Sequence, residues 1–109
     1  MPNKLKEEFP SKKIYVIDID NTICKTIGED YENAKPYPKR IVKINKLYDE
    51  GNTIIYLTGR GALTGKSWSD FTRKQLEQWG AKYFKLGFDK MIGDYYIDDK
   101  AINSKDFFK

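Results

Sequence analysis

Short apolar runs that end abruptly in polar residues set the strongest constraint on how this chain can fold. The run at 14–17, Ile-Tyr-Val-Ile, leads into Asp18, and the run at 53–57, Thr-Ile-Ile-Tyr-Leu, leads into Thr58. Continuous runs rich in β-branched residues are typical of strands that are buried on both faces, as in parallel sheets. We therefore predict two buried strands, each followed by polar side chains.

Two helices are predicted after these strands. Positions 41, 44 and 48 share one face of a helix that begins near Lys39, and Gly51 is suited to end it. The second helix begins at Ser67 or Ser69 and ends at Gly80.

Two shorter strands, at 83–86 and 95–97, complete the predicted order β-α-β-α-β-β. The segment 24–38 is predicted to be a loop, and residues 100–109 a turn of helix. Strands that alternate with helices favour right-handed crossovers and a parallel sheet with helices on its faces. We therefore expect a three-layer, Rossmann-like α/β fold with a short, mostly parallel sheet.

The length of 109 residues suits one domain, which we place at 13–109 after an N-terminal tail at 1–12. The single cysteine, Cys24, excludes an internal disulfide and fits a reducing compartment. No apolar run approaches the roughly 20 residues that span a bilayer, and the N-terminus does not resemble a secretory signal. We expect a cytoplasmic protein with no membrane partner.

The absence of histidine limits the chemistry of the chain. It excludes Ser-His-Asp and Cys-His catalytic units and zinc sites that are built on imidazole. The net charge of +4 includes several lysines near the two ends. This pattern is typical of solubilising termini and disfavours nucleic acid as a partner, whereas a small anionic substrate suits it.

Polar residues follow three of the four predicted strands, and they include Asp18 and Asp20, Thr58, and the pair Asp98 and Asp99. The carboxyl ends of parallel strands meet at one edge of a sheet, where ligands bind in open α/β folds. Clustered carboxylates repel one another unless a cation lies among them. An oxygen-only ligand set with few carboxylates favours Mg²⁺.

Such a site is suited to phosphoryl transfer. A carboxylate can attack phosphorus to form an aspartyl-phosphate, and a metal ion can screen the two negative partners from each other. A lysine, a hydroxyl and backbone N–H groups can bind the oxygens of the transferred group. A second carboxylate can move the protons.

The segment 14–22, IYVIDIDNT, resembles the first motif of the haloacid dehalogenase (HAD) superfamily of phosphohydrolases. The resemblance implies that Asp18 is the nucleophile and a metal ligand. It also implies that Asp20 is the general acid/base and binds the metal through its main-chain carbonyl. Thr22 ends the motif and is expected to support the site.

Two further segments resemble later motifs of this superfamily. TIIYLTGR at 53–60 implies that Thr58 and Gly59 bind phosphate, and YYIDD at 95–99 implies that Asp98 is a direct metal ligand with Asp99 in support. Asp94 imitates another form of the last motif, but it precedes the predicted strand.

The motif lysine is assigned to Lys90, in the loop before the last acidic pair. Lys85 is the alternative, although it sits within the third predicted strand. Lys90 is followed by methionine, whereas the family motif often has proline there. Arg60 could either contact substrate or pair with an acid, and the sequence leaves both open.

The small size resembles that of a compact HAD subgroup without a cap domain, associated with capsule and lipopolysaccharide biosynthesis. The TGRG segment at 58–61, the region around Trp68 and the YIDDKAI ending at 96–102 carry the same resemblance. The short segment at 24–38 leaves no room for a folded cap. The resemblance implies a small phosphorylated substrate, such as a sugar phosphate.

Two alternative functions stay open. A nucleic-acid 3′-phosphatase would share the same motifs. A receiver-like phosphoacceptor module also uses acids, threonine, lysine and Mg²⁺, although its acidic pair is adjacent rather than alternating. A sheet of about four strands leaves an edge that a second copy of the chain could cover.

Overall fold

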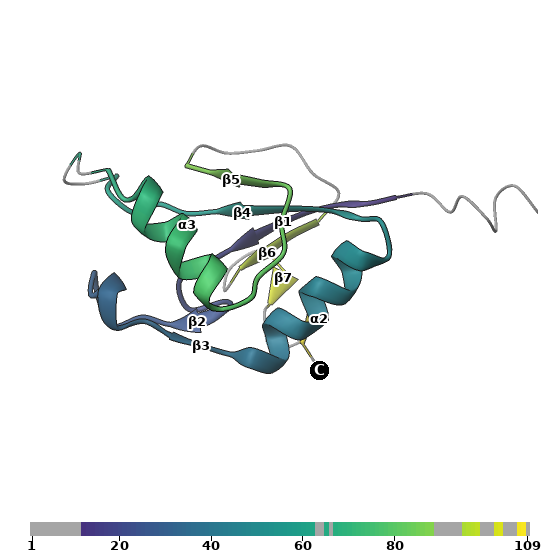
Figure 1. The fold of residues 1–109 in the computed structure, drawn as a ribbon, viewed down its shortest axis with the longest axis horizontal. Helices are drawn as coiled ribbons and strands as arrows, with labels where there is room; N and C mark the ends of the chain where they lie inside the picture. The colour runs from purple at the N-terminus through teal and green to yellow at the C-terminus, as the bar shows by residue number, and fades with distance from the viewer. Residues whose placement is uncertain are drawn as a thin grey trace, which may run out of the picture.

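The computed structural model describes residues 12–62, 65, 67–88, 95–98, 102–103 and 107–108. They form a small α/β structure around a five-stranded sheet with the order β5-β4-β1-β6-β7, in which every neighbouring pair is parallel (Figure 1). The strands are β1 (Ile14–Asp18), β4 (Thr53–Leu57), β5 (Lys85–Gly87), β6 (Tyr95–Asp98) and β7 (Ile102–Asn103).

Helix α2 (Pro38–Asp49) connects β1 to β4, and helix α3 (Ser69–Gln78) connects β4 to β5. Pro38 occupies the first position of α2, where its fixed φ suits a helix and its missing N–H costs nothing. Gly51 and Gly80 follow the two helices with φ of +97° and +71°, which only glycine adopts without strain. In the described part of the chain, no helix is long and apolar enough to cross a membrane.

Both helices lie on the same face of the sheet. Buried side chains of both helices pack in one core cluster with alternate residues of the strands. The helix residues are Ile41, Ile44 and Leu76, and the strand residues are Ile17, Ile54, Tyr56 and Ile97. Two right-handed crossovers that step in the same direction across a sheet put both helices on one face. The predicted parallel sheet is confirmed, whereas a second helical layer is not present among the described residues.

The segment 24–38, predicted to be a loop, contains two very short strands. β2 (Cys24–Lys25) and β3 (Lys35–Pro36) pair antiparallel, and a 3₁₀ turn, η1 (Tyr31–Asn33), lies between them. Strands of two residues are too short to leave a period-2 pattern in the sequence. This segment is small, and the described residues include no cap domain.

Two other sequence predictions needed correction. The third strand begins at Lys85 rather than at residue 83, although the N–H of Phe84 already bonds to the carbonyl of Ile54 in β4. The tail, predicted to be a turn of helix, contributes strand β7 beside β6. Residues 1–11 lie outside the described residues.

The order of the strands reverses beside β1. The chain passes from β1 to β4 and β5 on one side, and β6 and β7 lie on the other side (Figure 1). In open parallel sheets, such a switch point opens a crevice outside the carboxyl ends of the strands. The strands that carry Asp18 and Asp98 are the two that flank this point.

Candidate functional site

The backbone brings the ends of three strands together. Asp18, the last residue of β1, is level with Leu57 of β4, and Thr58 follows directly. On the other side, Ile17 is level with Ile97, so the register continued by one residue brings the backbone of Asp98 level with Asp18. Neighbouring strands are about 4.8 Å apart. The predicted convergence of these three positions is therefore confirmed for the backbone.

A tight turn follows β1 and presents Asp20. The carbonyl of Ile19 accepts hydrogen bonds from the N–H groups of Thr22 and Ile23, at 3.1 and 3.0 Å. Asn21 takes a left-handed conformation with φ of +63°, which asparagine tolerates better than most residues. Its side-chain oxygen accepts a hydrogen bond of 3.0 Å from the N–H of Thr26, which ties the turn to the segment after β2.

The side chain of Asp20 is held by Arg60. The Nε and Nη2 atoms of Arg60 donate to the two carboxylate oxygens of Asp20 at 3.0 and 2.9 Å, in a bidentate ion pair. The Thr26 hydroxyl donates to Asp20 Oδ1 at 2.6 Å. The Asp20 side chain keeps 21% of its surface exposed, whereas that of Arg60 is fully buried. Of the two roles left open for Arg60, the structure shows the pairing with an acid.

The rest of the guanidinium is also satisfied. Nη1 donates to Gln75 Oε1 at 2.8 Å and to Thr72 Oγ1 at 3.2 Å, both on α3. The Tyr31 ring lies 4.6 Å from the guanidinium carbon, within cation–π range. Gln75 in turn donates to the carbonyl of Tyr31 at 2.8 Å. Arg60 therefore links the turn after β1, the 3₁₀ turn and α3.

The two partners of Arg60 on α3 were not predicted from the sequence. Thr72 and Gln75 look like ordinary polar positions of a helix, but both are buried. Their spacing of three residues places them on one helical face, next to Leu76 of the core. This spacing was the feature of the sequence that could have indicated their burial.

The predicted phosphate-binding residues lie directly after β4. Thr58 is buried, its hydroxyl accepts a hydrogen bond from the N–H of Arg60 at 3.1 Å, and its N–H donates to the carbonyl of Gly87 at 3.0 Å. Gly59 is exposed, and a Cβ atom at this position would meet nothing within 4 Å. The backbone at Gly59 therefore faces open space at the carboxyl edge of the sheet.

Cys24 is a structural neighbour of Asp20. Its sulfur lies 3.8 Å from Asp20 Oδ1 and 3.4 Å from the Thr26 hydroxyl. Burial is the main cause that raises the pKa of the Cys24 thiol above its ordinary value. The thiol stays protonated at neutral pH, so it is not suited to act as a nucleophile.

Thr22 is fully buried, and its hydroxyl has no hydrogen-bond partner among the described residues. Replacing Thr22 with Val keeps the shape and removes the unsatisfied hydroxyl. We expect the free energy of unfolding, measured by urea denaturation, to stay unchanged or to rise by about 1 kcal/mol. Thr22→Ala should instead lower it by about 1 kcal/mol, because it also removes a buried methyl group. A loss of more than 1 kcal/mol in Thr22→Val would mean that the hydroxyl has a partner.

Lys90 and Asp99, like Asp94, lie outside the described residues, and for Asp98 only the backbone is described. Within the described residues, no three acidic, histidine or cysteine side chains form a metal-binding group. Asp18 and Asp98, whose backbones lie level at this edge, can offer only oxygen donors, and an oxygen-only set is the kind that Mg²⁺ prefers.

The alternative motif lysine, Lys85, begins β5 and is level with Ile55. This position is three residues before Thr58, so its Cα lies about 10 Å from the carboxyl edge. Lys90 therefore remains the better candidate.

A small hollow of about 200 Å³ lies beside the buried ion pair and is lined by Arg60, Ser67, Trp68, Ser69 and Phe88. The Trp68 ring packs edge-on against Tyr31, at 4.9 Å, and against Phe71, at 5.3 Å. The aromatic cluster thus both covers Arg60 and forms one wall of the hollow.

Comparisons with known proteins find relatives by structure only. No family model and no curated protein matches the chain. A conserved protein from Bacteroides thetaiotaomicron is 17% identical and has a TM-score of 0.68, over 90% of this chain and 88% of that chain. A protein from Vibrio cholerae is 21% identical with a TM-score of 0.67, over 88% of this chain and 87% of that chain. At these identities the similarity shows a shared fold and nothing about activity.

Proposed function

We propose that the chain is a Mg²⁺-dependent phosphomonoester hydrolase of the HAD type that works through an aspartyl-phosphate on Asp18. The observation that carries this proposal is the position of Asp18 and Asp98, level with each other on the two strands that flank the switch point. Thr58 follows the neighbouring strand on the other side of β1. This arrangement agrees with the order of motifs that resembles the HAD superfamily.

In the first half of the reaction, an oxygen of Asp18 attacks phosphorus while the bond from phosphorus to the leaving oxygen breaks. The Thr58 hydroxyl, the N–H of Gly59 and the Lys90 ammonium would bind the oxygens of the transferred group. Asp18, Asp98 and the main-chain carbonyl of Asp20, with Asp99 in support, would hold Mg²⁺. The bound ion would supply positive charge between the anionic nucleophile and the anionic substrate.

Asp20 would move the protons. It donates one to the leaving oxygen, and in the second half it takes one from the water that attacks phosphorus and releases phosphate from Asp18. Arg60 donates to both oxygens of Asp20, so one of these hydrogen bonds must open for Asp20 to carry the proton. Arg60 and Thr26 therefore act as positioning residues for Asp20.

The substrate of such a site is a small phosphorylated molecule, for which we favour a sugar phosphate. The hollow beside Arg60 offers a tryptophan and two serines next to the carboxyl edge of the sheet. Aromatic faces and hydroxyl groups are common in sites that hold sugar rings. A nucleic-acid 3′-phosphatase is the second candidate within the enzyme class, and a substrate panel separates the two.

The test is hydrolysis of p-nitrophenyl phosphate and of a panel of sugar phosphates and 3′-phosphorylated oligonucleotides. We expect turnover with Mg²⁺, its loss when EDTA is added, and its recovery when excess Mg²⁺ is restored. Turnover that is equal with and without the metal would contradict the proposed role of Mg²⁺. Absence of turnover on every substrate, together with a phosphorylated protein that persists for hours, would favour the receiver-like alternative.

A further inference from the structure

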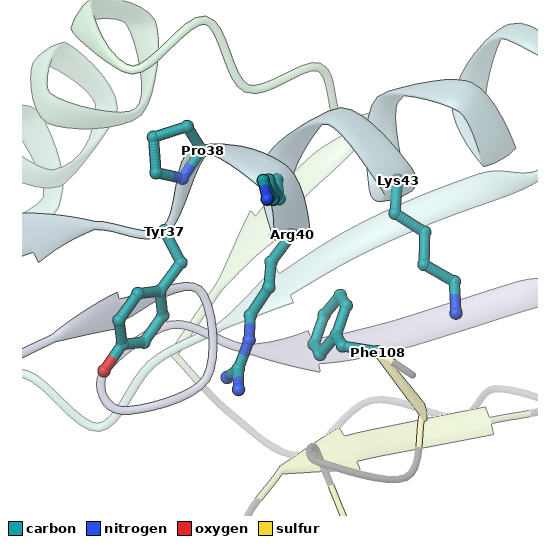
Figure 2. A pocket seen from close by; sticks show the side chains of 6 residues that line it. Tyr37, Pro38, Arg40, Lys43 and Phe108 are labelled. Atoms are coloured by element: carbon teal, nitrogen blue, oxygen red, sulfur yellow. The ribbon is translucent and has the colours of Figure 1, made fainter.

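A second pocket lies at the start of α2. It has a volume of about 670 Å³, and the described residues that line it are Tyr37, Pro38, Lys39, Arg40, Lys43 and Phe108. Figure 2 shows the Arg40 side chain between the rings of Tyr37 and Phe108, with Lys43 farther along the helix. This volume falls within the range that is usual for small-molecule sites, roughly 300–1,000 Å³.

The charge of this pocket is one-sided. Three of the six lining residues are cations and none is an acid. The dipole of α2 adds partial positive charge at its amino-terminal end. The first turn of α2 contains no acidic residue that would offset this charge. The pocket is therefore suited to an anion with more than one negative charge.

Two of the three cations, Arg40 and Lys43, are held in place by their surroundings. The guanidinium carbon of Arg40 lies 4.7 Å from the Tyr37 ring centroid and 4.8 Å from that of Phe108. Nη1 of Arg40 donates to the carbonyl of Thr22 at 2.8 Å. Lys43 donates to the carbonyl of Phe107, and its Nζ lies 4.2 Å from the ring of that residue. Because the aromatic rings and carbonyls fix these side chains, a ligand would lose little affinity to ordering them.

We propose that this pocket, formed by Tyr37, Lys39, Arg40, Lys43 and Phe108, is a binding site for a small phosphorylated anion, a phosphate ester or a diphosphate. The planar fork of an arginine matches phosphate oxygens, and two lysines nearby balance a charge of two or more. The site is separate from the hollow beside Arg60, with which it shares no lining residue. It does not depend on the proposed catalytic activity.

The test is a titration of the full chain with pyrophosphate, in EDTA so that no turnover occurs. The binding is monitored through the amide NMR signals of Tyr37 and of residues 39–43. We expect saturable shifts at these residues with a Kd of about 1 mM or lower. Inorganic phosphate should bind at the same residues more weakly, and acetate, a monoanion, should not bind.

The variants are chosen on the lysines because Arg40 also holds the turn after β1. Lys39→Gln with Lys43→Gln should weaken pyrophosphate binding about tenfold, and Lys39→Gln alone, at an exposed position, should weaken it about threefold. Lys46→Gln is the matched control, because it removes one charge from α2 outside the pocket.

No saturable shift up to 20 mM pyrophosphate, or equal binding by the double variant and the control, would overturn the proposal. Binding of a single-stranded oligonucleotide without binding of pyrophosphate would overturn it as well. Pyrophosphate binding in a protein without phosphatase activity would contradict the proposed function and leave this site standing.

Discussion

Replacement of Asp18 with Asn is expected to lower kcat/KM for p-nitrophenyl phosphate about 1,000-fold or more, to the background of the assay. An amide oxygen carries no negative charge, so it is a poor nucleophile toward phosphorus and a weaker ligand for Mg²⁺. Asp18 is the last residue of β1, and its replacement changes no side chain of the hydrophobic core, so the variant should fold. The measurement is steady-state kinetics with saturating Mg²⁺, with circular dichroism as a check on folding.

Asp49→Asn is the matched control for this substitution. Asp49 lies at the other end of α2, where its carboxylate makes an exposed ion pair with Lys82. The control should keep kcat/KM within twofold of the wild type, because it makes the same chemical change far from the carboxyl ends of the strands. Full activity in Asp18→Asn, or an equal loss in both variants, would show that Asp18 is not the nucleophile.

Replacement of Arg60 with Met is expected to lower the free energy of unfolding by about 3 kcal/mol, because it leaves partly buried polar groups without their donor. Asp20 would lose two hydrogen bonds, and the side-chain oxygens of Thr72 and Gln75 would lose one each. Arg60→Lys keeps the charge but not the planar fork, so its loss should be smaller, about 1–2 kcal/mol. Urea denaturation measures both values.

Arg73→Met provides the comparison. Arg73 pairs with Asp70 on the surface of α3, and the two side chains are 57% and 92% exposed. Such exposed pairs contribute about 0–1 kcal/mol, so this variant should unfold close to the wild type. If Arg60→Met were as stable as Arg73→Met, the ion pair with Asp20 would not be part of the folded structure in solution.

Much of the fold could be predicted from local signals. The runs at 14–17 and 53–57 are strands within one residue of the predicted ends, and the two glycines after the helices end them as expected. Hydrophobic periodicity and glycine conformation act over a few residues, so they leave a clear trace in the sequence. β2, β3 and β7 were missed because each has only two residues, which is too short to leave a periodic pattern in the sequence.

The site could be predicted only in part. Asp18 and Thr58 were predicted to lie at the same edge of the sheet because each comes at the end of a parallel strand. This prediction requires no knowledge of side-chain packing. The pairing of Arg60 with Asp20 joins residues 40 apart in the sequence, so no local pattern indicates it. Which acid pairs with an arginine depends on how the turn after β1 packs against α3, and this information is three-dimensional.

The most direct test of the central claim is chemical trapping of the phosphorylated aspartate during turnover. The protein is mixed with substrate and Mg²⁺ and quenched in acid, and the adduct is converted with hydroxylamine, which turns an acyl-phosphate into a stable hydroxamate. Mass spectrometry of the peptides then locates the modified residue. The account predicts the hydroxamate on Asp18 only in samples that contain substrate, and its absence in Asp18→Asn. A hydroxamate on another carboxylate, or none in a protein that is turning over, would contradict it.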